Sequence, residues 1–310
     1  MKRIQYHNYG GPETMGLEDF ELRKPGKGEV AVKVAFAAIN PIDWKVRNGY
    51  LKMVTGKVFP RAMGSDFSGT VISVGPGVMR FKPGDAVFGL APIKESGAFG
   101  QAVVTSVNFI AAKPEHVSFE DAACLGTPGV TAWNGLVDKA KLSAGKHIFV
   151  NGCSGAVGEA TVQIARMLGA AVSGSCSAAA MARARSLGVE AVYDYRATDL
   201  SKLGMHFDVV YDTAASMTVE TALGLLGPGG IFLDINPTPG KFIRSIFNRR
   251  LRPIVCTPRS DILDGIACAA KEGKLRLRVA EAVPLTEAIR LLTALEENRN
   301  LGGKSLVVMD

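Results

Sequence analysis

The sequence has few of the residues that bind metals, and those it has are spread along the chain. Its 310 residues include five cysteines, at positions 124, 153, 176, 256 and 268, and four histidines, at positions 7, 116, 147 and 206. No two of them have the close spacing of a CxxC knuckle or another paired ligand motif. The odd number of cysteines also argues against a secreted disulfide framework. We therefore expect reduced thiols that serve as small apolar side chains, and no metal site.

Long apolar runs are also missing. The segment MKRIQYHNYGGPE at the start has no apolar core of the kind that a signal peptide requires. No stretch approaches the roughly 20 apolar residues that would cross a bilayer. The 35 glycines are scattered, without low-complexity blocks or a fixed repeat. These absences favour an ordinary globular protein, which we expect to be cytoplasmic and to have no membrane span.

The charge balance is basic, with a formal net charge of +7 and a pI near 9.2. The densest basic segment is FIRSIFNRRLRPIVCTPR, which contains Arg244, Arg249, Arg250, Arg252 and Arg259. Two interpretations stay open for this segment. It is either a solvated face or a contact surface for phosphate or nucleic acid.

The length exceeds the roughly 250–300 residues at which one core stops growing, so we expect two domains. In the first part, GEVAVKVAFAAIN alternates Val30, Val32 and Val34 with smaller or polar residues, a period that is typical of a half-buried strand. FSGTVISVG, GDAVFGL and GAFGQAVVTS are further β-rich runs, separated by turn residues. Residues 1 to about 115 therefore form a predicted β domain.

The pattern changes after PEHVSFEDAACLG, where Ser118 and Asp121 form a capping box. Strands are predicted at 147–151, 171–175, 190–193, 207–212 and 230–235, with helices at 156–168, 178–187, near 216–226 and near 262–272. Apolar strands that alternate with amphipathic helices indicate a parallel sheet covered on both faces. The closing KSLVVMD is a lone strand that would pair back onto the β domain and make that domain discontinuous.

A glycine-rich turn connects the first of these strands to its helix. In NGCSGAVG (151–158), glycines occur three residues apart at a strand-to-helix junction. The first glycine permits a tight turn, the second lets the backbone approach a pyrophosphate, and the third lets the helix pack on the strand. The helix dipole and the free N–H groups of the first turn favour the anion. We predict that the cofactor contacts Gly152, Ser154, Gly155, Ala156, Val157 and Gly158; the alternative is a glycine-rich turn without a ligand.

The residues that follow indicate which dinucleotide binds. An NAD site needs a carboxylate about 20 residues after the turn, for the ribose 2′-hydroxyl. Between Glu159 and Glu190 the sequence has no Asp or Glu at all. Ser175 and Ser177 occupy the end of the second strand instead, and Tyr195 ends the next one. Hydroxyl donors without a repelling carboxylate favour the 2′-phosphate of NADP(H), with Arg183 as a further candidate contact.

Several segments together resemble a known family. INPIDWKVRNGY, GSDFSGTVISVGPGV, FKPGDAVFG, NGCSGAVGEATVQIARMLGA, SLGVEAVYDYR and GGKSLVVMD are similar, in this order, to the medium-chain dehydrogenase/reductase superfamily, and within it to the zinc-independent quinone oxidoreductase branch. The resemblance implies an α/β fold, with a GroES-like β domain at 1–118 and 275–310 and a doubly wound Rossmann domain at 119–274. It also implies homodimers that form through the edge of the Rossmann sheet.

The resemblance also suggests roles for single residues. Zinc-dependent relatives have cysteine and histidine where this chain has Asn40 and Ser65, neither of which is a competent Zn²⁺ ligand. Asn40, Lys45 and Tyr50 match the wall beside the substrate, and Asp43 is expected to make a structural hydrogen bond. Thr131 and Asn236 match positions that border the nicotinamide. Lys304 is interpreted as a surface lysine, with a contact to the adenylate as the alternative.

These implications favour an NADPH-dependent, zinc-independent oxidoreductase that transfers hydride to a small-molecule quinone or an α,β-unsaturated carbonyl. Such acceptors are already electrophilic, so the protein mainly has to position them and donate to the developing oxyanion. An acyl-chain enoyl reductase of the same fold is one alternative. An NADPH-binding protein that binds RNA through the arginine segment is another, although no nucleic-acid motif accompanies that segment.

Overall fold

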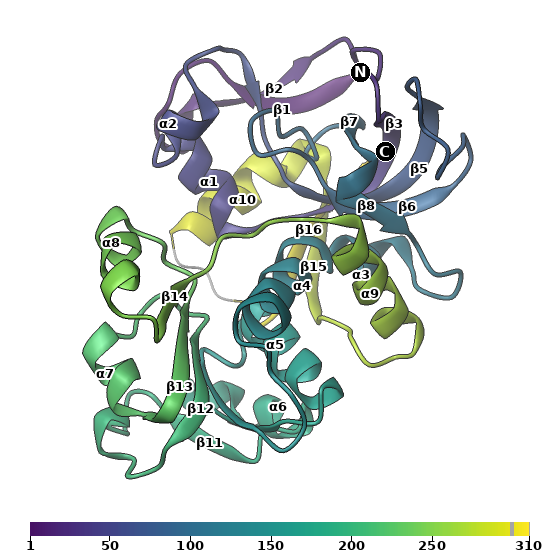
Figure 1. Ribbon diagram of the computed structural model, residues 1–310. Coiled ribbons are helices and arrows are strands. Elements are labelled where there is room, and N and C mark those ends of the chain that lie inside the picture. Colours follow the sequence, from purple (N-terminus) through teal and green to yellow (C-terminus); the bar gives the residue numbers. More distant parts are fainter. Residues whose placement is uncertain (298–300, 310) are drawn as a thin grey trace. The chain divides into compact units, whose positions relative to one another are not determined.

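The protein divides into two compact units, described here from a computed structural model of residues 1–297 and 301–309 (Figure 1). Unit 1 contains Met1–Thr127 and Pro258–Asp310, and unit 2 contains Pro128–Thr257. In the described residues, no helix has both the length and the apolar character that a membrane crossing needs.

Unit 1 is built mainly from strands that come from both ends of the chain. Its strands are β1 (Lys2–Tyr6), β2 (Met15–Asp19), β3 (Glu29–Ala38), β4 (Arg61–Ala62), β5 (Asp66–Val74), β6 (Ala86–Leu90), β7 (Ala102–Ser106), β8 (Ile110–Ala112), β15 (Val279–Pro284) and β16 (Lys304–Val308). Its helices are α1 (Pro41–Arg47), α2 (Lys52–Thr55), α3 (Phe119–Ala123), α9 (Ser260–Lys271) and α10 (Ala288–Glu296), while α4 (Gly126–Trp133) crosses into unit 2.

The main sheet of unit 1 is organised around β3. Its strand order is β15-β16-β3-β5-β6-β8, and β7 also pairs with β3. Val30, Val32 and Val34 are buried while Lys33 is exposed, which confirms the strand expected from the alternating pattern. A second sheet has the order β2-β1-β4.

The final strand closes this sheet. β16 pairs antiparallel with β3, where Leu306 lies opposite Ala38, and parallel with β15 on its other side. The prediction that the last strand returns to the first domain is confirmed.

Unit 2 contains alternating strands and helices. Its strands are β9 (His147–Asn151), β10 (Ala171–Cys176), β11 (Ala191–Asp194), β12 (Phe207–Asp212), β13 (Leu226–Asp234) and β14 (Leu251–Pro253). Its helices are α5 (Ala156–Met167), α6 (Met181–Ser186), α7 (Val219–Gly224) and α8 (Pro239–Phe247).

The sheet of unit 2 has the order β11-β10-β9-β12-β13-β14, and every neighbouring pair is parallel. This is the 3-2-1-4-5-6 order of a doubly wound dinucleotide-binding sheet. In Figure 1, α5 and α6 lie on one side of these strands, and α7 and α8 lie on the other. The fold class predicted from the sequence is therefore confirmed. Ligands of such sheets bind outside the carboxyl ends of the strands, at the point where the strand order reverses. In this sheet that point lies between β9 and β12.

The unit boundaries differ from those we expected at 118/119 and 274/275. The structure assigns residues 119–127 and 258–274 to unit 1. The reason is packing: α3 lies against β3 and β5, and α9 lies against β8, with Ile262, Leu263 and Ile266 buried. Helical character alone did not reveal which sheet these helices cover.

Candidate functional site

The glycine-rich turn of unit 2 joins β9 to α5 and has little room for side chains. Gly152 has φ +79°, in the left-handed region that favours glycine. A Cβ at Gly158 would lie 2.0 Å from the carbonyl oxygen of Gly152, so helix and turn could not pack as closely with any other residue. A Cβ at Gly155 would meet a single atom within 4 Å, that same oxygen at 3.5 Å. The turn is therefore tight on its inner side and open at Gly155, as a bound pyrophosphate requires.

Helix α5 begins immediately after this opening. Gly155 is its N-cap and is exposed, and Ser154, Ala156 and Val157 are half-buried. The first N–H groups of a helix have no acceptor within it and point toward a ligand at the N-terminus. The structure thus brings all six predicted residues of the turn together at one helix start.

Glu159 lies in the first turn of α5, where an unpaired carboxylate would repel a phosphate. Its two oxygens accept hydrogen bonds from Arg183 of α6: Nε donates to one, and Nη2 donates to the other over 2.6 Å. Arg183 therefore neutralises Glu159. Because its guanidinium is engaged with this carboxylate, the prediction that Arg183 contacts the phosphate was wrong. Sequence spacing alone could not reveal this pairing across two helices.

The three hydroxyl residues predicted to read the 2′ position differ in exposure. Ser175 is fully buried, and its Oγ donates to the side-chain oxygen of Asn151 over 2.6 Å, so it is not available to a ligand. Ser177 is half-buried at the end of β10, and its side chain does not cap the short helix that follows. Tyr195 is 50% exposed, and the guanidinium of Arg196 lies 5.5 Å from its ring centroid. The ends of the paired strands β10 and β11 thus present Ser177 after β10, and Tyr195 and Arg196 after β11.

A buried polar network supports the carboxyl edge of this sheet, and the sequence analysis missed it. The Asn151 amide donates to Asp212 over 2.8 Å and to Ser216 over 3.0 Å. Asp212 also accepts the backbone N–H groups of Ala214 and Met217, and burial raises the pKa of its carboxyl. The available signal was positional, because Asn151 and Asp212 are the last residues of apolar parallel strands.

The two residues expected beside the nicotinamide lie in different settings within unit 2. Thr131 is 6% exposed on α4, and its carbonyl oxygen accepts the hydroxyl of the buried Tyr211 over 2.8 Å. Asn236 is exposed two residues after β13, and its N–H donates to Asp234 over 2.7 Å. Asn236 is therefore open to a ligand at the carboxyl edge of the sheet, whereas the Thr131 side chain is buried.

A second polar network lies inside unit 1, at the start of α1. The Asn40 amide donates to Asp66 over 2.9 Å and to the carbonyl of Ala38 over 3.2 Å. Its oxygen accepts from Nζ of Lys304 over 2.7 Å, and that ammonium also donates to the carbonyl of Ile39 over 2.6 Å. Asn40, Asp66 and Lys304 are all at most 5% exposed. Lys304 is therefore not the surface lysine that we expected, and Asn40 orients buried groups of its own unit.

Asp43 and Asp66 are the buried acids of this network. Asp43 accepts the Asn40 N–H over 2.8 Å and the Ser65 hydroxyl over 3.3 Å, which confirms its expected structural hydrogen bond. Burial raises the pKa of Asp43 to about 7. Burial also raises the pKa of Asp66, although Lys304 opposes this shift and Thr127 donates two hydrogen bonds to its carboxylate.

The other two predicted catalytic residues lie on the surface of unit 1. Lys45 is exposed on α1, and Tyr50 is 76% exposed just after it, with its N–H donating to the carbonyl of Lys45. Neither side chain has an ion pair or hydrogen bond within the described part of the chain. Both are free donors, whereas Asn40 is not.

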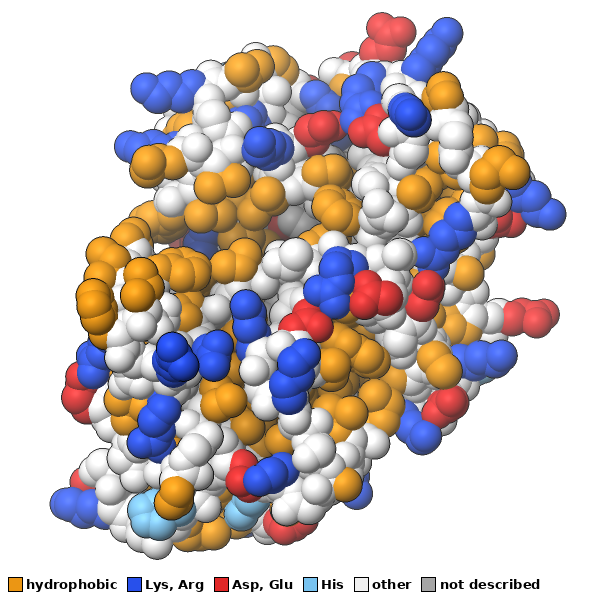
Figure 2. Space-filling view, in the orientation of Figure 1, with side chains coloured by type: hydrophobic (Ala, Val, Ile, Leu, Met, Phe, Trp, Pro, Cys, Tyr) orange, Lys and Arg blue, Asp and Glu red, His pale blue; other side chains and the backbone are white. Residues whose placement is uncertain are grey.

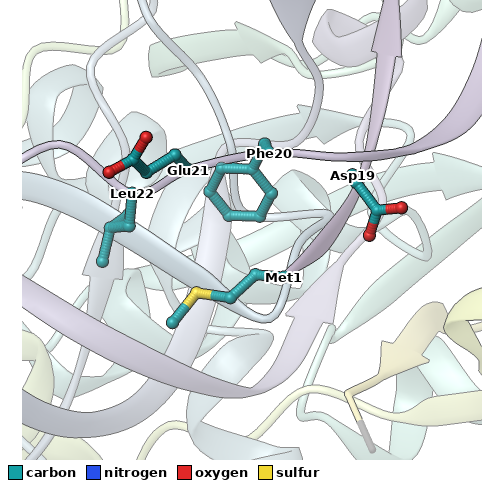
Figure 3. Close-up of a pocket in the computed structure, with 5 residues that line it drawn as sticks. All are labelled: Met1, Asp19, Phe20, Glu21 and Leu22. Atoms are coloured by element: carbon teal, nitrogen blue, oxygen red, sulfur yellow. The ribbon is translucent and has the colours of Figure 1, made fainter.

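A separate hollow near the start of the chain does not contribute to the site. Figure 3 shows the residues that line it, which are Met1, Asp19, Phe20, Glu21 and Leu22. The Phe20 ring is covered by the guanidinium of Arg3 at 4.6 Å. No predicted site residue lines this hollow.

Comparison with known proteins identifies the family. Residues 26–189 match the model described as alcohol dehydrogenase GroES-like domain, and residues 187–307 match the model described as zinc-binding dehydrogenase. The chain belongs to the medium-chain dehydrogenase/reductase superfamily. The predicted pairing of a GroES-like domain with a Rossmann domain is confirmed.

Individual members of the superfamily are similar over most of the chain. The chloroplast envelope quinone oxidoreductase homolog of Arabidopsis thaliana is 30% identical over 305 residues, which cover 93% of this chain and 92% of the relative. The 2-methylene-furan-3-one reductase of Solanum lycopersicum is 34% identical over 74% of this chain and 61% of its own. The solved quinone oxidoreductase from Coxiella burnetii has a TM-score of 0.91 and 27% identity, and covers 100% and 99% of the two chains. The chain is thus an oxidoreductase of the medium-chain family.

Because the second family model is described as zinc-binding dehydrogenase, we asked whether the side chains of this chain could bind a zinc ion. The family resemblance matches Asn40 and Ser65 to the positions that hold zinc ligands in zinc-dependent relatives. The Asn40 oxygen already accepts from the Lys304 ammonium, and a second cation there would be repelled. No group of three or more His, Cys, Asp or Glu side chains suited to a metal occurs among residues 1–297 and 301–309. These residues do not fit a zinc ion.

Proposed function

We propose that this medium-chain enzyme uses NADPH to transfer hydride, without zinc, to quinones or α,β-unsaturated carbonyls. The observation that carries the proposal is the turn of unit 2, which is open at Gly155 and is followed by Glu159, whose carboxylate is neutralised by Arg183. The relatives named quinone oxidoreductase and furanone reductase support the class of acceptor. A homodimer, which the family resemblance implies, and the cytoplasmic location expected from the sequence are part of the same proposal.

The choice of NADPH over NADH rests on the neighbouring ends of β10 and β11. A 2′-phosphate there would meet Ser177, Tyr195 and Arg196, which are half-buried or exposed. Two further facts support it: Glu159 is neutralised, and the sequence has no other acid before Glu190. The residues of the site therefore fit a nucleotide with an additional phosphate.

The residues of each unit would have distinct tasks in the reaction. Bound NADPH supplies a hydride from its nicotinamide ring. Gly155, Ala156 and Val157 would hold the pyrophosphate, and Asn236 would contact the nicotinamide half. Lys45 and Tyr50, as free donors on unit 1, would hydrogen-bond the acceptor oxygen as it gains negative charge.

The partners of the arginine segment bear on one of the alternative functions. Arg244, Arg250 and Arg259 of the arginine segment are bound to Glu220, to backbone carbonyls and to Asp261, so three of its five cations already have partners. This weakens the RNA-binding reading. Enoyl reduction on an acyl chain stays the closest alternative, since it needs the same cofactor site and differs only in the acceptor.

The test is to follow NADPH absorbance with the purified full chain, offering a polycyclic ortho-quinone and a short alkenal in parallel. We expect oxidation with at least one acceptor, and slower oxidation of NADH. NADPH binding without turnover of either acceptor, but with reduction of an enoyl thioester, would move the function to the acyl-chain class. Absence of NADPH binding would contradict the proposal as a whole.

A variant separates the cofactor choice from the activity. Arg196→Ser should raise the KM for NADPH by roughly ten- to hundredfold, because a charge-assisted hydrogen bond contributes about 1.5–3 kcal/mol. The KM for NADH should stay nearly constant. Lys202→Ser is the matched control. Lys202 is exposed and lies shortly before β12, near the amino ends of the strands, whereas Arg196 follows the carboxyl end of β11. Equal effects of Arg196→Ser on both nucleotides would disprove the assignment.

A further inference from the structure

Helix α8 of unit 2 turns its apolar face toward solvent, whereas an ordinary surface helix turns it toward the core. Phe242, Ile243, Ile246 and Phe247 lie within one face at 100° per residue, yet they are 44%, 59%, 73% and 85% exposed. A surface helix normally turns such a face toward the core. Figure 2 shows the apolar side chains gathered on the outside over α8.

The opposite, polar face attaches the helix to its own unit. Lys241 forms an ion pair with Asp234, which is fully buried at the end of β13, and the guanidinium of Arg244 donates to Glu220 of α7 over 2.7 Å. The helix also packs against β14. The outward direction of the apolar face is thus fixed by ion pairs and packing on the inner side.

The charge around this face is of one sign. From Ile235 to Ser260 the sequence contains Lys241 and five arginines, and no Asp or Glu. Arg249 lies two residues after α8 and Arg252 lies on β14. Both are exposed, and neither has an ion pair with any residue that the structure describes. Val255, 53% exposed, extends the apolar surface beside them. We call this set, Phe242, Ile243, Ile246, Phe247, Arg249, Arg252 and Val255, the α8 surface.

We propose that the α8 surface binds the face of an anionic lipid bilayer. A helix that carries isoleucine and phenylalanine on one face, with arginines beside it, lies in a membrane interface with the apolar side chains below the headgroups. Unpaired arginines at that level are attracted by anionic headgroups. The proposal concerns attachment to one leaflet and is independent of the reaction that the enzyme catalyses.

Other partners match only half of this surface. A nucleic acid would satisfy Arg249 and Arg252 but would leave four large apolar side chains in water. A second copy of the chain placed on α8 would cover the apolar face but would bring the same unpaired arginines together, and like charges repel. The homodimer of the proposed function would form through the edge of the Rossmann sheet, not through α8. An anionic bilayer satisfies both features at once.

The test is co-sedimentation of the full chain with vesicles of phosphatidylcholine, with and without phosphatidylglycerol, at low and high salt. We expect binding to the vesicles that contain phosphatidylglycerol, weakened by salt, and little binding to phosphatidylcholine alone. The pair Arg249→Gln and Arg252→Gln should lower the partition coefficient on the order of thirtyfold, since each cation near such a surface contributes about 1 kcal/mol. The pair Ile246→Ser and Phe247→Ser should lower it on the order of a hundredfold.

Matched variants on unit 1 provide the controls. Lys27→Gln with Arg278→Gln removes two exposed cations, and Val58→Ser with Met79→Ser removes two exposed apolar side chains, 80% and 94% exposed. Both control pairs should bind vesicles like the wild type. All variants should keep the wild-type melting temperature and affinity for NADPH, because none of these residues lies in the cofactor site.

Three outcomes would overturn the proposal. The first is an absence of binding to anionic vesicles at low salt. The second is binding that survives both substitutions of the α8 surface. The third is RNA binding or self-association that Ile246→Ser with Phe247→Ser abolishes while vesicles do not bind, which would assign the surface to that partner instead.

Discussion

Asp43 is a residue of unit 1 whose charge state is strongly affected by its surroundings. Burial raises the pKa of its carboxyl from 3.8 to about 7, so the folded chain binds this proton more tightly than the unfolded chain. Its contribution is most favourable at low pH and is lost as the pH rises through about 7. Asparagine resembles the protonated carboxyl and can still accept the Asn40 N–H.

We therefore expect Asp43→Asn to become more stable relative to the wild type as the pH rises. The difference in the free energy of unfolding should shift by about 1.4 kcal/mol for each pH unit between roughly 5 and 7. Urea titrations across this range would measure it. Asp19→Asn, at an exposed acid, should show no such trend. Parallel pH profiles of Asp43→Asn and the wild type would show that the carboxyl does not titrate in this way.

Single residues also show where sequence reasoning was limited. The sequence predicted that Asp43 makes a structural hydrogen bond, and the structure shows that it does so in the capping box with Asn40 at the start of α1. It did not predict that Lys304 reaches Asn40, since 264 residues separate them. The prediction that the Ser175 hydroxyl contacts the cofactor was wrong for a similar reason. Its hydroxyl donates to Asn151 on the neighbouring strand β9, and the sequence does not show which strands are neighbours.

At the scale of elements, the junction of β9 and α5 depends on one close approach. Gly158→Ala would place a methyl group 2.0 Å from the carbonyl oxygen of Gly152, so helix and turn must move apart. We expect a loss of about 1–3 kcal/mol in the free energy of unfolding and a marked loss of NADPH affinity. Denaturant titration and fluorescence titration with NADPH would measure the two effects.

Two other glycines separate these effects. Gly155→Ala should leave stability nearly unchanged, because its methyl would contact a single atom at 3.5 Å, but it should weaken NADPH binding by occupying the open side of the turn. Gly224→Ala, in α7, meets nothing within 4 Å and should change neither property for the worse. Full stability and affinity in Gly158→Ala would contradict the assigned packing.

The elements themselves were largely predictable. Apolar runs at 147–151 and 207–212 coincide with β9 and β12, because strands that are buried on both faces leave a continuous hydrophobic signal. Helix α8 was not anticipated, and the segment was interpreted only as a cluster of charge. Its apolar face points outward, so the usual reasoning from amphipathic pattern to core does not apply to it.

The last strand, β16, matters for the fold of unit 1 but not for that of unit 2. β16 lies between β15 and β3, and it carries Lys304 into the buried network of unit 1. Unit 2 has all six of its strands within residues 128–257. A chain that stops at residue 300 should therefore lose the fold of unit 1 and keep much of that of unit 2.

Limited proteolysis followed by mass spectrometry would reveal this difference. We expect protected fragments within 128–257, and rapid cleavage of the segments on either side. Val308→Thr, at the end of β16, is the control, since it keeps the backbone pairing and should be as resistant as the wild type. Uniform resistance of the shortened chain would show that β16 is dispensable.

The position of β16 also sets an order of events during synthesis. Chains fold as they leave the ribosome, with segments that are complete forming first. The first 127 residues of unit 1 emerge early, yet their main sheet lacks its partner strands until the final residues are made. The nucleotide-binding unit, encoded in the middle, can finish before the unit that begins the chain.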